Sequence, residues 1–118
     1  MQIKERVNFK FDISSNHQFL IKAIKSTNIL VIGGAGTIGS SYIKQILKYK
    51  PSKITVVDIN ENGLTELTRD LRSSNLLDYN PEYITYPVNL LSDTFDKIFN
   101  SESWQVVANF SAHKHVRS

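Results

Sequence analysis

A glycine-rich segment between an apolar run and an amphipathic pattern constrains this chain more than any other feature. The apolar run, Ile29 to Ile32, predicts a strand buried on both faces of a parallel sheet. Glycines follow at Gly33, Gly34, Gly36 and Gly39. Apolar residues then recur at helical spacing, and they are Ile38, Tyr42, Ile43, Ile46 and Leu47. A strand, a glycine turn and a helix in this order are typical of the phosphate-binding turn of a dinucleotide-binding fold.

The glycines of such a turn have different physical tasks. One adopts a backbone conformation that a Cβ atom would forbid, one lets a pyrophosphate approach the main chain, and another lets the helix pack closely on the strand. The N–H groups at the start of the helix, near Thr37 and Ile38, then face the phosphates together with the positive end of the helix dipole. A tight turn without a ligand is the alternative. The flanking strand and helix favour phosphate binding.

Composition excludes several other classes. The 118 residues suffice for one domain, and the absence of cysteine excludes a disulfide framework and a thiolate metal site. The net charge of +3 is mild, and its basic residues are not interleaved with aromatic ones, so no nucleic-acid partner is expected. No apolar run reaches membrane-spanning length and no secretory segment is present. We therefore expect a soluble cytoplasmic chain without a membrane partner.

Strands and helices alternate along the rest of the chain. Residues 1–26 predict an N-terminal extension with an extended segment and a short helix, and residues 27–118 predict the nucleotide-binding domain. Further strands are expected at 53–58, 83–88 and 104–110, and helices at 37–49, at 61–73 and from about 92 onwards. This alternation predicts an α/β fold, namely the first half of a Rossmann-type parallel sheet in the order 3-2-1-4 with flanking helices.

An acidic residue closes the second expected strand. Asp58 follows Gly39 by 19 residues, which suits a carboxylate that accepts hydrogen bonds from the ribose hydroxyls of adenosine. The same carboxylate would repel a 2′-phosphate, so NAD is the predicted cofactor, with NADP as the alternative. The competing interpretation is a helix cap, a task that Asp58 or Asn60 would suit.

Three segments together carry a family resemblance: Ile29 to Ser40, Asp58, and Ser111 to Val116. They resemble the extended short-chain dehydrogenase/reductase superfamily, and within it the nucleotide-sugar dehydratases and epimerases of polysaccharide biosynthesis, the UDP-N-acetylglucosamine 4,6-dehydratase group. The resemblance implies a dinucleotide cofactor and a UDP-sugar substrate. The predicted cofactor contacts are Gly33, Gly34, Gly36, Thr37, Ile38, Gly39, Asp58, Ile59, Asn60, Asn89, Leu90, Ser111, Ala112 and Lys114.

The sequence departs from this group at several positions. Ile32 stands where the group commonly has threonine, and Ser111 where it often has alanine. Many relatives place an aspartate after the third strand to contact the adenine, whereas this chain has Val88 and Asn89 there. The side chain of Asn89 is a candidate to replace that contact.

No catalytic residue is predicted. The family's Tyr-x-x-x-Lys pair belongs to a helix after a fifth strand; Tyr49 and Lys53 match its spacing by chance, because Pro51 lies between them. His113 and His115 lack a third ligand for a metal site. We expect the N-terminal part of a longer enzyme that is inactive by itself. A stand-alone nucleotide-binding or redox-sensing module is the alternative, and the sequence leaves open whether the protein forms a homo-oligomer.

Overall fold

The computed structural model describes residues 24–111, so the expected extended segment and most of the expected helix within residues 1–26 lie outside the described residues. The strands are β1 (Asn28–Ile32), β2 (Lys53–Val57), β3 (Glu82–Tyr86) and β4 (Val106–Asn109). The helices are α2 (Thr37–Ile46), a short 3₁₀ helix η1 (Leu47–Tyr49), α3 (Glu61–Ser73) and α4 (Asp93–Asn100).

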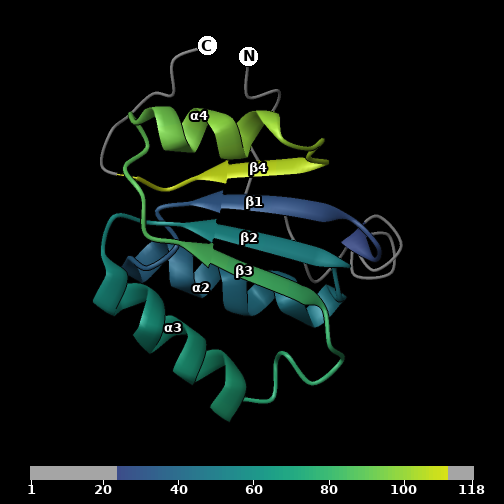
Figure 1. Cartoon of the computed structure of the whole chain (residues 1–118). Coiled ribbons are helices and arrows are strands. Elements are labelled where there is room, and N and C mark those ends of the chain that lie inside the picture. The colour runs from purple at the N-terminus through teal and green to yellow at the C-terminus, as the bar shows by residue number, and fades with distance from the viewer. Residues whose placement is uncertain (1–23, 112–118) are drawn as a thin grey trace.

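The four strands form one parallel sheet in the order β3-β2-β1-β4 (Figure 1). In the register, Ile29 lies between Ile54 of β2 and Val106 of β4, and Ile32 lies between Val57 and Asn109. All four carboxyl ends therefore lie at one edge of the sheet. The predicted parallel sheet and its order 3-2-1-4 are confirmed.

The helices cover the two faces of this sheet unequally, because α2 and α3 lie on one face and α4 on the other (Figure 1). Successive residues of β1 point to opposite faces. Ile29 and Val31 belong to a core cluster with residues of α2 and α3, whereas Leu30 and Ile32 belong to a second cluster with Phe95 of α4. The uninterrupted apolar run of β1 is thus explained by burial on both faces.

Helix α3 follows its expected bounds exactly, whereas α2 ends earlier than the predicted helix 37–49. The last three residues of that range form η1, and Lys50 then adopts a left-handed conformation with φ of 58°. The residue before a proline avoids the helical region, and Pro51 follows here. The chain therefore turns at Lys50 and enters β2 only three residues later.

One residue of the predicted apolar stripe of this helix was assigned wrongly. Ile38 is 70% exposed, whereas Ile43 and Ile46 are buried in the core. Ile38 belongs to the first turn of α2, directly after the glycine turn, and its side chain is not covered by the sheet. The spacing was correct, but the helix begins to cover the sheet only after this turn.

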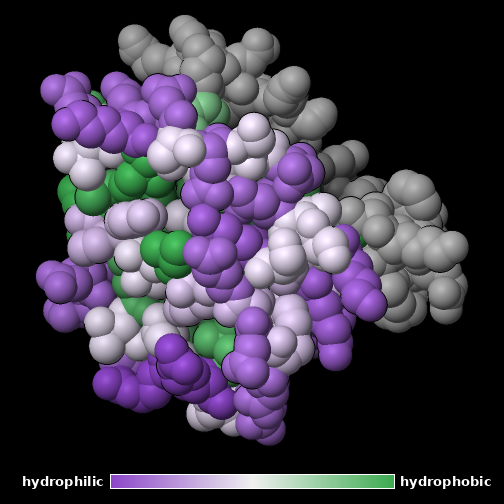
Figure 2. Space-filling model, turned by 45° about the vertical axis from the view of Figure 1, so that its right-hand side comes forward, coloured by the Kyte–Doolittle hydropathy of each residue, from purple (hydrophilic) through white to green (hydrophobic). Residues whose placement is uncertain are grey.

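The third and fourth strands are shorter than the expected ranges 83–88 and 104–110. Trp104 packs with the α4 cluster instead of extending β4, and its Nε1 donates to the Phe99 carbonyl oxygen at 2.9 Å. Within residues 24–111, none of the helices has the length and apolar character needed to cross a membrane. Hydrophilic residues cover much of the face in Figure 2, where apolar residues form small separate patches.

Candidate functional site

A cavity of about 410 Å³ opens at the carboxyl edge of the sheet. It lies where the connections after β1, β2, β3 and β4 meet, which is the switch point of an order 3-2-1-4. Its lining includes seven of the predicted contact residues: Gly33, Gly36, Asp58, Ile59, Asn89, Leu90 and Ser111. Ile32, Val57, Val88 and Phe110 complete the lining, so most of its wall is apolar.

The glycine turn brings β1 against the end of β4. Gly33 has a φ of +77°, a conformation that side chains rarely adopt. A Cβ atom on Gly33 would lie 2.6 Å from the Ser111 backbone nitrogen, so the two segments touch here through backbone atoms. Gly36 differs, because it lines the cavity and an added Cβ would find only the Gly33 carbonyl oxygen, at 3.7 Å.

Two other glycines of the turn do not line the cavity. A Cβ on Gly34 would collide with Val56 on β2, and one on Gly39 would collide with the Gly33 carbonyl. Both residues are buried, and they permit α2 to start close to the sheet. These two glycines thus allow the turn to pack tightly without lining the cavity themselves.

Helix α2 begins without the N-terminal side-chain caps that α3 and α4 have. Its N-cap is Gly36, which offers no side chain, and its first turn holds no acidic residue. By contrast, Asn60 caps α3 and Ser92 caps α4, each through a side-chain oxygen, and both helices carry acids in the first turn. The first N–H groups of a helix carry partial positive charge. The start of α2 is therefore suited to an external anion.

The carboxylate of Asp58 holds two backbone turns together. Its Oδ2 accepts from the Ala35 backbone N–H at 2.9 Å, and its Oδ1 accepts from the Asn60 N–H at 2.9 Å. The cap of α3 is made by Asn60 instead, whose Oδ1 accepts from the Gly63 N–H at 2.9 Å. Of the two candidates for that cap, the structure selects Asn60. Asp58 remains at the cavity, where carboxylate oxygens retain further acceptor capacity.

Three strand ends at this edge use the same local hydrogen bond. Like Asp58, Asn89 accepts through Oδ1 from the N–H two residues later, that of Leu91, at 2.8 Å. Asn109 accepts in the same way from the Ser111 N–H at 2.9 Å. These turns shape the segments around the cavity. Asn109 was not predicted from the sequence, although an Asn at the end of a buried apolar run is a recognisable turn signal.

The remaining predicted contacts lie around or beyond the cavity. Thr37 and Ile38 form the first turn of α2 and are exposed. Ile59, which lines the cavity, is 68% exposed. Ala112 and Lys114, like His113 and His115, lie outside the described residues. Within the described part of the chain, no group of three acidic or histidine side chains could hold a metal ion.

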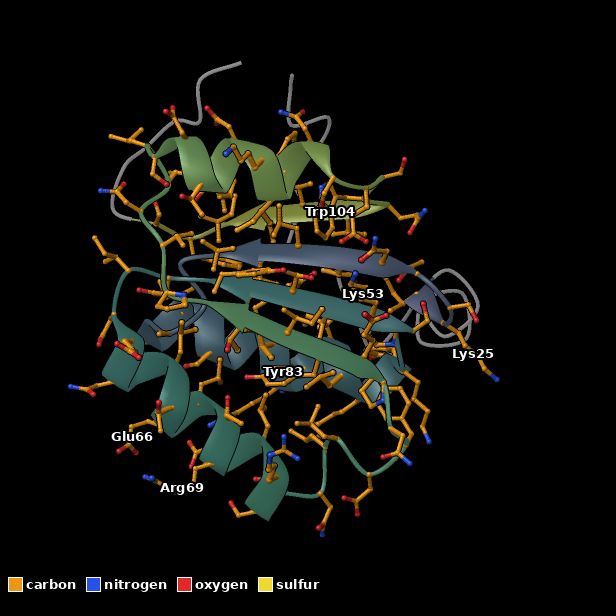
Figure 3. All side chains as sticks on the ribbon, in the orientation of Figure 1. Lys25, Lys53, Glu66, Arg69, Tyr83 and Trp104 are labelled. Carbon is orange, nitrogen blue, oxygen red and sulfur yellow. The ribbon has the colours of Figure 1, made fainter. Side chains whose placement is uncertain are left out.

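The Tyr49 and Lys53 pair is far from this edge. Lys53 starts β2 at the opposite, amino edge of the sheet, and its Nζ binds Glu102 at 2.8 Å (Figure 3). Tyr49 is buried in the α2 and α3 core. Neither residue lines the cavity.

Two curated proteins match the chain. An uncharacterized membrane protein, MJ1061, of Methanocaldococcus jannaschii is 46% identical over 52 residues, which cover 44% of this chain and 16% of that protein. The capsular polysaccharide biosynthesis protein CapD of Staphylococcus aureus is 26% identical over 102 residues, which cover 80% of this chain and 16% of CapD. The chain thus spans about a sixth of the length of these relatives.

Solved structures share the fold. Pen from Bacillus thuringiensis is 30% identical with a TM-score of 0.62, over 79% of this chain and 27% of Pen. The Bordetella bronchiseptica enzyme WbmF, solved in complex with NADH, is 18% identical with a TM-score of 0.54, over 75% of this chain and 23% of WbmF. WbmF has also been solved with NAD+ and UDP.

The family match covers most of the chain and all of the cavity lining. The family described as polysaccharide biosynthesis protein matches residues 29–118. Every residue that lines the cavity falls within this range. The chain belongs to the polysaccharide biosynthesis protein family.

Proposed function

We propose that this chain forms the NAD-binding part of a nucleotide-sugar dehydratase or epimerase that acts in polysaccharide biosynthesis. The observation that carries the proposal is the cavity at the carboxyl edge, which joins the glycine turn, Asp58 and the ends of β3 and β4. The family supports a role in polysaccharide biosynthesis. WbmF, which shares the fold, binds NAD+ and UDP in its solved complex, and this supports a dinucleotide and a UDP-sugar as ligands.

The described residues fit the two ends of an adenosine diphosphate group. Gly36 leaves space beside the uncapped start of α2, where the N–H groups of the first turn would face the pyrophosphate. Asp58 would accept from the ribose hydroxyls, because a carboxylate that already accepts two backbone N–H groups is held in one orientation. The apolar wall around Ile59 and Leu90 would take the base.

The reaction chemistry belongs to the cofactor and to residues elsewhere. A bound NAD would supply the site with reversible hydride transfer to and from the sugar. The described residues would bind and orient the adenosine end and exclude water from it. We assign no proton-transfer residue to them, since Tyr49 and Lys53 are remote from the cavity. We also propose that the protein works in the cytoplasm.

A direct test titrates NAD into the chain by calorimetry, with Gly36→Val as the comparison. The branched side chain would fill the space beside the start of α2, so binding should be lost while the circular dichroism spectrum and the melting transition remain. Unchanged affinity in a folded Gly36→Val variant would reject this site.

A non-catalytic nucleotide-binding module is the second candidate, and the remote position of Tyr49 and Lys53 favours it. Reading the gene beyond Ser118 discriminates between the two candidates. A Tyr-x-x-x-Lys sequence downstream of Ser118 would support the enzyme, and its absence from the downstream part of the reading frame would support the module.

A further inference from the structure

The outer edge of β3 has unpaired backbone groups. β3 is the end strand of the sheet, and no strand within residues 24–111 pairs with its outer side (Figure 1). The Glu82 N–H donates to the loop before β2, and the Tyr86 carbonyl oxygen accepts from the residue after β2. In a strand of a parallel sheet, successive residues direct their backbone groups to opposite sides. The N–H and C=O groups of Tyr83 and Thr85 therefore point away from β2.

Two prolines bound this open edge. Pro81 lies two residues before Tyr83, and Pro87 lies two residues after Thr85. Proline has no N–H and cannot donate to a further strand. A strand added to this edge would thus pair over a short stretch centred between Tyr83 and Thr85.

A groove of about 480 Å³ lies between this edge and helix α3. Thr85 and Pro87 line its strand side, and six residues of α3 line the other. Among these six, Glu61 is exposed in the first turn of α3 and Arg72 is exposed in the last turn. Within the described part of the chain, neither of these two side chains forms an ion pair. The groove therefore has a negative end and a positive end.

The six helical residues are arranged symmetrically about the middle of α3. They form three pairs equally far from that midpoint: Glu61 with Arg72, Leu64 with Arg69, and Thr65 with Thr68. A 2.8 Å hydrogen bond between the hydroxyls of Thr68 and Tyr83 fixes the level of the helix against the strand. α3 runs opposite to β3, with a rise of about 1.5 Å per residue against about 3.3 Å in the strand (Figure 1). Ile84, the next residue of β3, therefore lies level with the middle of α3.

We propose that this edge binds the same edge of a second copy of the chain, with the two β3 strands antiparallel about a two-fold axis at Ile84. Tyr83 of each copy then lies opposite Thr85 of the other, and each such pair exchanges both of its backbone hydrogen bonds. The same axis places Glu61 of each copy across from Arg72 of the other. Every contact of a two-fold interface occurs twice, so a surface with oppositely charged ends at equal distances from the axis complements itself.

This interface is separate from the cavity at the carboxyl edge. None of the residues that line the groove also lines the cavity. The inference therefore goes beyond the proposed function and does not depend on it. Dinucleotide binding and dimer formation can be measured independently on the same chain.

The test reverses the charge at one end of the groove at a time. In Glu61→Arg both ends become basic, and in Arg72→Glu both become acidic, so each variant repels itself. An equimolar mixture brings a basic groove against an acidic one and restores both charge matches. Asp96→Arg and Lys97→Glu are the matched controls, because these residues are exposed on α4 at the other face of the sheet (Figure 1).

Sedimentation velocity at chain concentrations up to about 1 mM, which covers weak association, gives the dimer dissociation constant. We expect the wild-type chain to dimerise and each groove variant to raise this constant at least about tenfold, since attraction becomes repulsion twice in each dimer. The mixture should dimerise like the wild-type chain, and so should both controls. Melting transitions show whether each variant is folded.

Amide hydrogen exchange of the wild-type chain tests the strand pairing without any substitution. Exchange at Tyr83 and Thr85 should slow as the chain concentration rises, and this result decides the matter if a groove variant does not fold. A monomeric wild-type chain, or exchange at these two amides that is independent of concentration, would overturn the inference. A dimer that neither groove variant weakens, or a mixture of folded variants that stays monomeric, would also overturn it.

Discussion

The carboxylate of Asp58 accepts a hydrogen bond from the backbone N–H of Ala35, with 2.9 Å between Oδ2 and the nitrogen. This bond joins the end of β2 to the glycine turn after β1, although 23 residues separate the two partners. The acid that would select the ribose thus also holds the turn that would bind the pyrophosphate. Under the proposed function, this bond would couple recognition of the two groups.

The first prediction concerns the choice between NAD and NADP. Asp58 lines the cavity, and the next three residues, Ile59 to Glu61, include no basic side chain to accept a 2′-phosphate. NAD should bind about tenfold more tightly than NADP, a difference of roughly 1.4 kcal/mol. Calorimetric titration with both cofactors measures this, and equal or tighter binding of NADP would contradict it.

A pair of alanine substitutions should distinguish a glycine that shapes the turn from the one that lines the cavity. Gly34→Ala places a methyl group against Val56, and such overpacking costs about 1–3 kcal/mol of unfolding free energy. In Gly36→Ala the added methyl group would lie 3.7 Å from the Gly33 carbonyl oxygen, which is ordinary contact. The free energy of unfolding of this variant should therefore stay near the wild-type value. Urea denaturation of both variants gives the comparison. A Gly34→Ala variant as stable as Gly36→Ala would show that the turn moves without cost.

An ion pair at the opposite edge should make stability depend on pH. The hydrogen bond from Lys53 lowers the pKa of Glu102 from its usual 4.5, with smaller help from Asn28. A lowered folded-state pKa adds stability that is complete above pH 4.5 and lost as the pH falls through the folded value. Glu102→Gln should therefore cost under about 1 kcal/mol at pH 7, as partly exposed pairs do, and less at pH 3, which lies below the usual pKa of 4.5.

Chemical denaturation of the wild-type chain and Glu102→Gln at both pH values tests this ion pair. Glu66→Gln is the control, because Glu66 pairs with Arg69 at an exposed position on α3. A Glu102→Gln deficit that is equal at pH 3 and pH 7 would mean that packing, and not charge, accounts for the effect.

The chain by itself should bind NAD but convert no nucleotide sugar. The contacts that we propose at the cavity are for adenosine and pyrophosphate, and we assign a proton-transfer role to none of the described residues that line it. Positioned acid–base groups contribute about 10² to 10⁴ in rate, and alignment of the two reactants adds more. Incubation with NAD and UDP-N-acetylglucosamine should yield no 4-keto sugar. Multiple-turnover product would reject the proposal that catalysis resides elsewhere.

The sequence by itself determined the parallel sheet and its strand order. Those features follow from local patterns: the apolar run of β1, the glycines after it, and the cap candidates Asp58 and Asn60 before the helix expected at 61–73. Each pattern lies within a few residues of the element that it specifies. Periodicity and capping act over the same short distance, which is why these predictions held.

Only the tertiary structure decided what each residue of the turn does. Gly33 and Gly34 are adjacent in sequence, yet the first touches Ser111 of the segment after β4 and the second packs against Val56 of β2. Ile38 fits the helical stripe but lies where no strand covers it. The partner of each residue comes from a distant segment, and its identity depends on how strands and helices meet in space, which no local pattern encodes.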